Sequence, residues 1–393
     1  MSSLSRRLAG SARLAGLAGL ALAASLLAAA SARADIIKFS ALMRGLTMTQ
    51  EQCSALPQAV WISAAGKSFC VRYYLSTAGG SGDRPVVMLQ GDQIGRFDPR
   101  TQSFEIAPEA KTEDTDTDNF VKYADAMSRR FKGPAIYLAR IGLDGSSGFH
   151  GIRHTMLELY ATNQALEAIK RRHHFAGFHL IGQSGGATLV GGLLGLRNDI
   201  ACAVPGSGNL IQLAAAKNPN STPTAWIDPA AMAPAIVKSS KARILVVTDP
   251  NDTVVPAERQ TGFVSRLRHA GGTVEQLFVQ ATDEKHHGVT LYAVFAMDGC
   301  IHGATDGEIE KRLAAYVKSR VASAKPNVKV DARADAKTDT KADVRPNRKR
   351  DVTAEAPREP GPTGGVAVGG RSGDGPRAEV SARKPSDVMP PKG

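Results

Sequence analysis

The sequence predicts an α/β fold built on one doubly wound, mostly parallel sheet. Short apolar runs alternate with segments of helical spacing between residues 69 and 321. These runs are apolar at nearly every position, as is typical of strands that are buried on both faces. Because crossovers between parallel strands are right-handed, this alternation places helices on both faces of the sheet.

The individual elements are predicted from their composition and from the turn residues and prolines that bound them. The first strand is rich in aromatic and β-branched residues, and the later strands are short apolar runs next to turn residues. A proline opens the helix at 256–269, where its missing N–H has no helical partner to lose. We expect strands at 69–76, 85–90, 135–139, 178–182, 200–204, 243–248 and 273–280, and helices at 120–131, 154–172, 187–196, 256–269 and 306–321.

The first 34 residues have the pattern of an export signal. Arginines near the start precede an apolar run over 14–30, and Ala32-Arg33-Ala34 is a small-x-small cleavage site. The run is short for a membrane anchor, which is the alternative. The sequence therefore predicts a secreted or periplasmic protein that is cleaved near Ala34, with a folded domain over 35–323.

The segment 324–393 is predicted to be a disordered basic tail. It consists largely of Lys, Arg, Asp, Ala, Pro and Gly, with almost nothing to bury. The chain has a formal net charge of +12, but the tail and the signal hold most of the excess. The domain between them is close to neutral, which argues against a nucleic-acid-binding protein. The tail is either a solvated spacer or a contact for anionic envelope polymers.

The four cysteines are expected to form two disulfides, because export leads to an oxidising compartment. Three pairings are possible. We favour Cys53–Cys70 with Cys202–Cys300, since the first pair is local in the sequence. Buried free thiols are the alternative.

A Gly-x-Ser-x-Gly motif at 182–186 follows a predicted strand and opens a predicted helix. This pattern is typical of a sharp strand-to-helix turn that exposes a nucleophilic serine, here Ser184. The flanking glycines leave room for the neighbouring strand and helix. The helix N-terminus also favours negative charge that develops beside Ser184.

Two later loops supply a candidate acid and a candidate base. The loop after the strand at 243–248 contains Asp252, just before Val-Val-Pro, with Asp249 as the alternative. The loop after the strand at 273–280 contains His287, with His286 as the alternative. We favour His287 because Gly288 beside it allows the backbone to turn. A carboxylate can orient a histidine, and that histidine can take the proton of a serine.

The order Ser184, Asp252, His287 resembles the α/β-hydrolase superfamily over about 69–321. Within it the chain is similar to secreted serine esterases, dienelactone hydrolases and prolyl-oligopeptidase-like proteins. The resemblance implies an oxyanion hole made by the backbone N–H of Gly185 and by the loop 90–93, where we expect Asp92 or its neighbour to donate. Gln90 stands where the family usually has histidine.

The resemblance implies a serine hydrolase that forms an acyl-enzyme on Ser184, acts on a small-molecule ester or amide and uses no metal or organic cofactor. The segment 206–234 is long enough for a small lid only. Arg153 and His154 either contact an anionic group of the substrate or form a cap and a salt bridge. An acyltransferase with the same triad, or a non-catalytic envelope binding protein on this fold, are the alternative functions.

Overall fold

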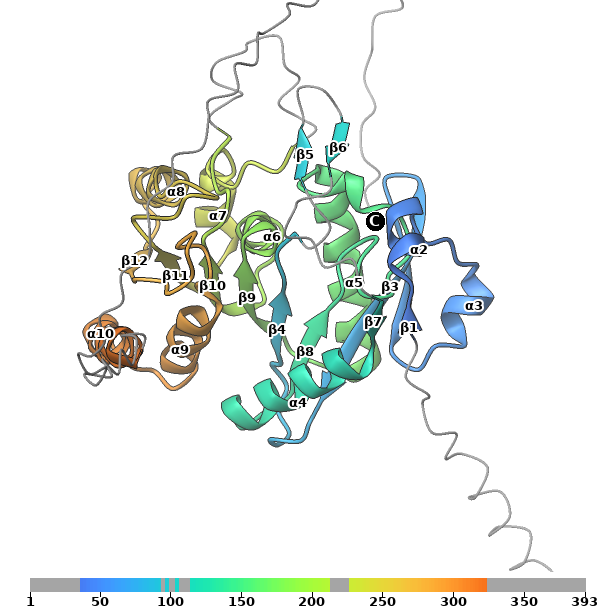
Figure 1. The fold of residues 1–393 in the computed structure, drawn as a ribbon, viewed down its shortest axis with the longest axis horizontal. Coiled ribbons are helices and arrows are strands. Elements are labelled where there is room, and N and C mark those ends of the chain that lie inside the picture. The colour runs from blue at the N-terminus through green and yellow to red at the C-terminus, as the bar shows by residue number, and fades with distance from the viewer. Residues whose placement is uncertain (1–35, 93–95, 99–102, 106–113, 213–225, 324–393) are drawn as a thin grey trace, which may run out of the picture. The chain divides into compact units, whose positions relative to one another are not determined.

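The computed structural model describes residues 36–92, 96–98, 103–105, 114–212 and 226–323. The predicted signal and tail lie outside this part of the chain, so both stay predictions. The main sheet has eight strands in the order β12-β11-β10-β9-β4-β8-β3-β2 (Figure 1). Their bounds are β2 Ala59–Ala64, β3 Lys67–Ser76, β4 Val86–Leu89, β8 Ala135–Leu138, β9 Phe178–Gln183, β10 Ile200–Gly206, β11 Arg243–Thr248 and β12 Glu275–Phe278.

The sheet is mostly parallel. All neighbours from β8 to β12 run parallel, while β3 runs antiparallel to β8 and to β2. The chain passes from β4 to β8 and then crosses back over β4 to β9, so the strand order reverses around β4. This strand order is that of the α/β-hydrolase fold, which confirms the predicted fold class. Loops at the carboxyl ends of β4 and β9 therefore meet at the point where such folds bind ligands.

Helices cover both faces of the sheet (Figure 1). In β4, Val87 and Leu89 pack into one core with α5 to α8, whereas Val86 and Met88 pack into the other with α4, α9 and α10. Alternate side chains of a strand point to opposite faces, so a strand covered on both sides must be apolar throughout. The helix bounds are α4 Asp118–Phe131, α5 Met156–His173, α6 Gly185–Leu194, α7 Ala233–Ser239, α8 Glu258–His269, α9 Thr290–Ile301 and α10 Asp306–Ser323.

Several elements were not predicted. The strand β2 adds an antiparallel edge, and α7 and α9 were not expected as helices. The helix α9 packs between the sheet and α10, so both of its sides are covered and its sequence shows no amphipathic stripe. The remaining short elements are β1 Ile36–Ile37, α2 Phe39–Arg44, α3 Gln50–Ser54, β5 Arg96–Asp98, β6 Ser103–Glu105, β7 Thr115–Asp116 and the 3₁₀ turn η1 His150–Ile152.

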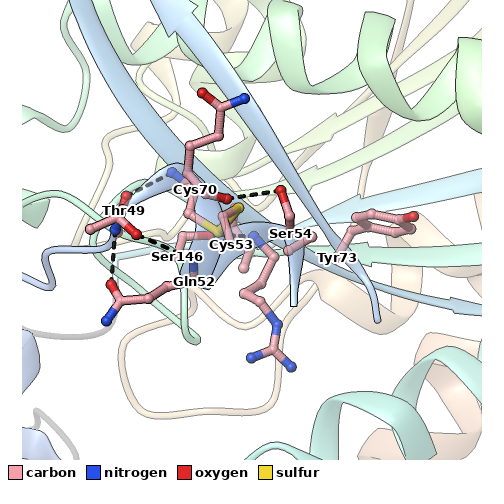
Figure 2. The surroundings of a disulfide bond; sticks show 12 residues. Thr49, Gln52, Cys53, Ser54, Cys70, Tyr73 and Ser146 are labelled. Atoms are coloured by element: carbon pink, nitrogen blue, oxygen red, sulfur yellow. Dashed lines mark hydrogen bonds between the residues drawn. A yellow bond between two sulfur atoms is a disulfide. The ribbon is translucent and has the colours of Figure 1, made fainter. Parts of the chain in front are cut away.

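The predicted disulfide pairing is confirmed. Cys53 of α3 is bonded to Cys70 of β3, and Cys202 of β10 is bonded to Cys300 of α9. Figure 2 shows the first bond, in α3, together with Thr49, which precedes this helix and forms a capping box with Gln52. The second bond fixes α9, the helix that directly follows the loop of the candidate base.

Within the described residues, no helix combines the length and the apolar character needed to cross a membrane. Residues 213–225 lie outside the described part, so the small lid stays a prediction. Next to this gap, Trp226 is half-buried and pairs with Thr155 as an isolated antiparallel bridge.

Candidate active site

Ser184 lies on a strained turn between β9 and α6. Its φ and ψ are 53° and −118°, a conformation that L-residues rarely adopt. Its N–H donates to the carbonyl of Gly206 at 2.9 Å. The flanking glycines are needed for space: a Cβ on Gly182 would lie 2.5 Å from the carbonyl oxygen of Gly186, and one on Gly186 would collide with the carbonyl of Leu89. The turn therefore has the geometry that the motif predicts.

Asp252 and His287 are in direct contact. The Nδ1 of His287 lies 2.8 Å from Oδ2 of Asp252, whose side chain is fully buried. The other oxygen, Oδ1, accepts N–H bonds from Val254 and Val255, each at 2.9 Å. An ionised carboxylate has only acceptors, so this contact places a proton on Nδ1 and leaves Nε2 of the neutral ring able to accept one.

The two alternatives form a separate pair. Nδ1 of His286 lies 3.2 Å from Oδ2 of Asp249, which is also fully buried. This carboxylate accepts N–H bonds from Asn251 at 2.8 Å and from Ala281 at 2.6 Å. Each histidine thus contacts its own aspartate: the two preferred residues pair with each other, and so do the two alternatives.

The turn of the base loop differs from the prediction. The residue with left-handed backbone is His286, at φ 53°, and not Gly288. At Gly288 a Cβ would lie 2.8 Å from Oδ1 of Asp283, so a larger residue there requires this carboxylate to shift. That carboxylate accepts the N–H groups of His287 at 3.0 Å and Gly288 at 2.8 Å. Burial raises the pKa of the Asp283 carboxyl, but these backbone hydrogen bonds outweigh it and lower the pKa below its usual value.

Gln183 links the base loop to the nucleophile turn. Its Nε2 donates to the carbonyl of His287 at 2.7 Å, and its Oε1 accepts from the hydroxyl of Thr290 at 3.3 Å. The residue before Ser184 therefore holds the main chain of the candidate base. Within the described residues, the Ser184 hydroxyl forms no hydrogen bond with either histidine, so the nucleophile–base contact stays a prediction. Such contacts are often loose in unliganded enzymes.

The loop after β4 lies against the same turn. A Cβ on Gly91 would lie 3.0 Å from Cβ and 3.6 Å from Oγ of Ser184, and a Cβ on Gly185 would collide with Oδ1 of Asp92. The N–H of Gly185 is in the first turn of α6, where amides have no helical partner. Of the predicted oxyanion groups, Gly185 follows Ser184 directly and Asp92 lies against Gly185, whereas Gln93 lies outside the described residues. Their donation to an oxyanion stays a prediction.

A charged cluster next to this loop was predicted only in part, because Arg140 and Glu158 were not expected in it. The Asp92 carboxylate lies 2.7 Å from Nη1 of Arg140, 3.0 Å from Nε of Arg153 and 2.8 Å from Nε2 of His154. Arg140 also pairs with Glu158 at 2.8 Å. Burial raises the pKa of the Asp92 carboxyl, but His154 and Arg140 outweigh it and hold this pKa well below its usual range. Of the two interpretations of Arg153 and His154, the structure shows the salt bridge.

No family model matches the chain, and no curated protein matches it in sequence. Among solved structures, the chain is similar to the acylaminoacyl peptidase of Pyrococcus horikoshii, with 12% identity and a TM-score of 0.43 over 67% of this chain and 41% of that chain. An esterase of Pyrococcus furiosus matches with 16% identity and a TM-score of 0.42 over 68% of this chain and 96% of that chain.

A puromycin-hydrolyzing peptidase of Mycobacterium tuberculosis matches with 12% identity and a TM-score of 0.42, over 66% of this chain and 42% of that chain. This chain thus spans less than half the length of both peptidases. Because identities and scores are low, the assignment of the fold rests on the strand order and not on these similarities.

Proposed function

We propose that this chain is a serine hydrolase that cleaves a carboxylic ester or amide through an acyl-enzyme on Ser184. The observation that carries the proposal is the contact between His287 and the buried carboxylate of Asp252, on a loop that Gln183 ties to the nucleophile turn. A binding protein on this fold has no use for an imidazole oriented by a buried carboxylate, on a loop tied to the turn of a strained serine.

The proposed reaction has two halves. Ser184 Oγ attacks the carbonyl carbon and gives its proton to Nε2 of His287, while Asp252 stabilises the imidazolium that forms. The tetrahedral intermediate collapses as the imidazolium donates this proton to the leaving alcohol or amine. Water then attacks the acyl-enzyme, again with His287 as base, and releases the carboxylic acid and the free serine.

The oxyanion of each tetrahedral intermediate is the main charge to be stabilised. In the proposal, the N–H of Gly185 and an N–H of the loop Gln90–Asp92 donate to it. The N-terminus of α6 adds the positive end of a helix dipole at the same point. Fixed donors of this kind are effective because they need no reorganisation when the charge develops.

The proposal extends to location and partners. We propose a secreted or periplasmic enzyme that is cleaved near Ala34. The two disulfides support an oxidising compartment. The substrate is a small-molecule ester or amide, and the tail over 324–393 is proposed as a spacer or as a contact for anionic envelope polymers.

A panel of p-nitrophenyl esters and aminoacyl p-nitroanilides tests the function. The wild-type protein should release nitrophenol or nitroaniline, and Ser184→Ala should abolish this release while it keeps the thermal unfolding midpoint. Ser207→Ala is the matched control, because Ser207 also directly follows a strand, β10, and has a positive φ of 48°, but its side chain is buried. The control should turn over like the wild type. Equal activity in Ser184→Ala would refute the assignment, and a predominant ester product with an added alcohol would identify an acyltransferase.

A further inference from the structure

A buried arginine lies directly beside the loop that follows β4. Arg140 comes just after β8, and its side chain is 1% exposed. Its guanidinium donates from Nε to Oε1 of Glu158 at 2.8 Å and from Nη2 to Oε2 at 3.2 Å. Glu158 belongs to α5 and is also fully buried. This two-point contact fixes the plane of the guanidinium.

The third nitrogen of the Arg140 guanidinium, Nη1, contacts the loop after β4. Nη1 of Arg140 donates to Oδ1 of Asp92 at 2.7 Å and to the carbonyl of Gln90 at 3.3 Å. The two contacts lie on either side of Gly91, the residue that packs against Ser184. A single guanidinium thus connects both ends of the short segment that carries the proposed oxyanion donors.

The network also touches the nucleophile turn. A Cβ on Gly185 would lie 2.6 Å from Nη1 of Arg140 and would collide with the Asp92 carboxylate. The loop is therefore constrained from α5 and from the start of α6.

We propose that Arg140 is a positioning residue that holds the segment Gln90–Asp92 over the nucleophile turn, so that its backbone N–H groups point at the oxyanion. The inference rests on the proposed function and deepens it. Stability alone is a poor reason for this network, because the desolvation of buried ion pairs largely cancels their attraction. The placement of an oxyanion donor is a better reason for the network, because a displacement of such a donor by about 1 Å lowers the rate by about 100-fold.

Arg140 has a second effect at the same point. The Asp92 carboxylate lies next to Gly185, where a negative charge would repel the developing oxyanion. Arg140 and Arg153 contact this carboxylate and offset its charge, and Nε2 of His154 lies 2.8 Å from it. The network thus permits an acidic side chain beside a site that must stabilise negative charge.

The test compares Arg140→Lys with Arg197→Lys. Arg197 is a matched control, because its side chain is 2% exposed and contacts Asp199 at 2.6 Å and Glu167 at 2.7 Å, in the connection from α6 to β10. Lysine keeps the charge but loses the planar fork. We expect Arg140→Lys to lower kcat by about 10- to 100-fold with KM changed by less than about threefold, and Arg197→Lys to leave both near wild type.

A second measurement distinguishes a loss of oxyanion positioning from a general loss of structure in the variant. A boronic acid forms a tetrahedral adduct on the serine, so its affinity should fall with kcat in Arg140→Lys and not in Arg197→Lys. Asp92→Ala removes the acceptor that Nη1 of Arg140 contacts at one end of the segment, so it should also lower kcat. This variant tests the inference if Arg140→Lys does not fold. Equal kcat in both arginine variants, or wild-type kcat in Asp92→Ala, would overturn the inference alone. An inactive wild-type protein would overturn the proposed function and this inference together.

Discussion

Replacing Asp252 by asparagine should remove most of the activity without unfolding the protein. Oδ1 of Asp252 accepts two backbone N–H bonds, from Val254 and Val255. The asparagine keeps both only if its oxygen takes that position, and its NH₂ group then faces Nδ1 of His287. This forces Nδ1 to accept and moves the ring proton to Nε2, where the base must be free.

The expected loss in kcat is on the order of 10⁴-fold, the typical effect of a wrong histidine tautomer in such triads. It corresponds to about 5 kcal/mol of transition-state stabilisation. The assay is steady-state hydrolysis of a p-nitrophenyl ester together with thermal unfolding, and Asp249→Asn is the control. Asp249 is equally buried but faces His286, so its variant should keep kcat and lose about 1–3 kcal/mol of stability from weakened backbone hydrogen bonds. A larger loss of kcat in Asp249→Asn would refute the assignment of the acid.

Three further outcomes are expected. Gly186→Ala should lower the unfolding midpoint because its Cβ would collide with β4, whereas Gly307→Ala, where a Cβ meets nothing within 4 Å, should raise stability by about 0.5–1 kcal/mol. The double variant Cys202→Ala/Cys300→Ala should lose about 2–5 kcal/mol in chemical denaturation, because the bond closes a span of 98 residues. Asp92 has a lowered pKa, so its contribution to stability is full above its unfolded pKa and is lost as pH falls through the lower folded value. The stability gap between wild type and Asp92→Asn should therefore shrink as unfolding is measured from pH 6 towards pH 2, and a constant gap would contradict this.

The fold could be predicted because its signals are local. Strands such as β4 and β11 are apolar at nearly every position, which follows from burial on both faces. The helix α9 could not be predicted in the same way. It is covered by the sheet on one side and by α10 on the other, so it lacks the polar stripe by which a surface helix is recognised.

In the candidate site, too, residues with a local sequence signal could be predicted, and residues placed by the tertiary structure could not. Ser184 could be predicted because the turn requires small residues at fixed spacing around it. The choice between Asp252 and Asp249 depends on how the loop folds, which the sequence does not encode at any fixed spacing. The network of Asp92, Arg140 and Glu158 was missed because its members come from three separate segments, and only the sheet topology brings them together.

Labelling of the purified protein with a fluorophosphonate tests the central claim most directly. Peptide mass spectrometry should locate a single phosphonyl group on Ser184, and prior reaction with a boronic acid should prevent the labelling. Labelling should be lost in Ser184→Ala and strongly slowed in His287→Ala, but retained in His286→Ala. A phosphonyl group on another residue, or equal labelling of Ser184→Ala, would contradict the account.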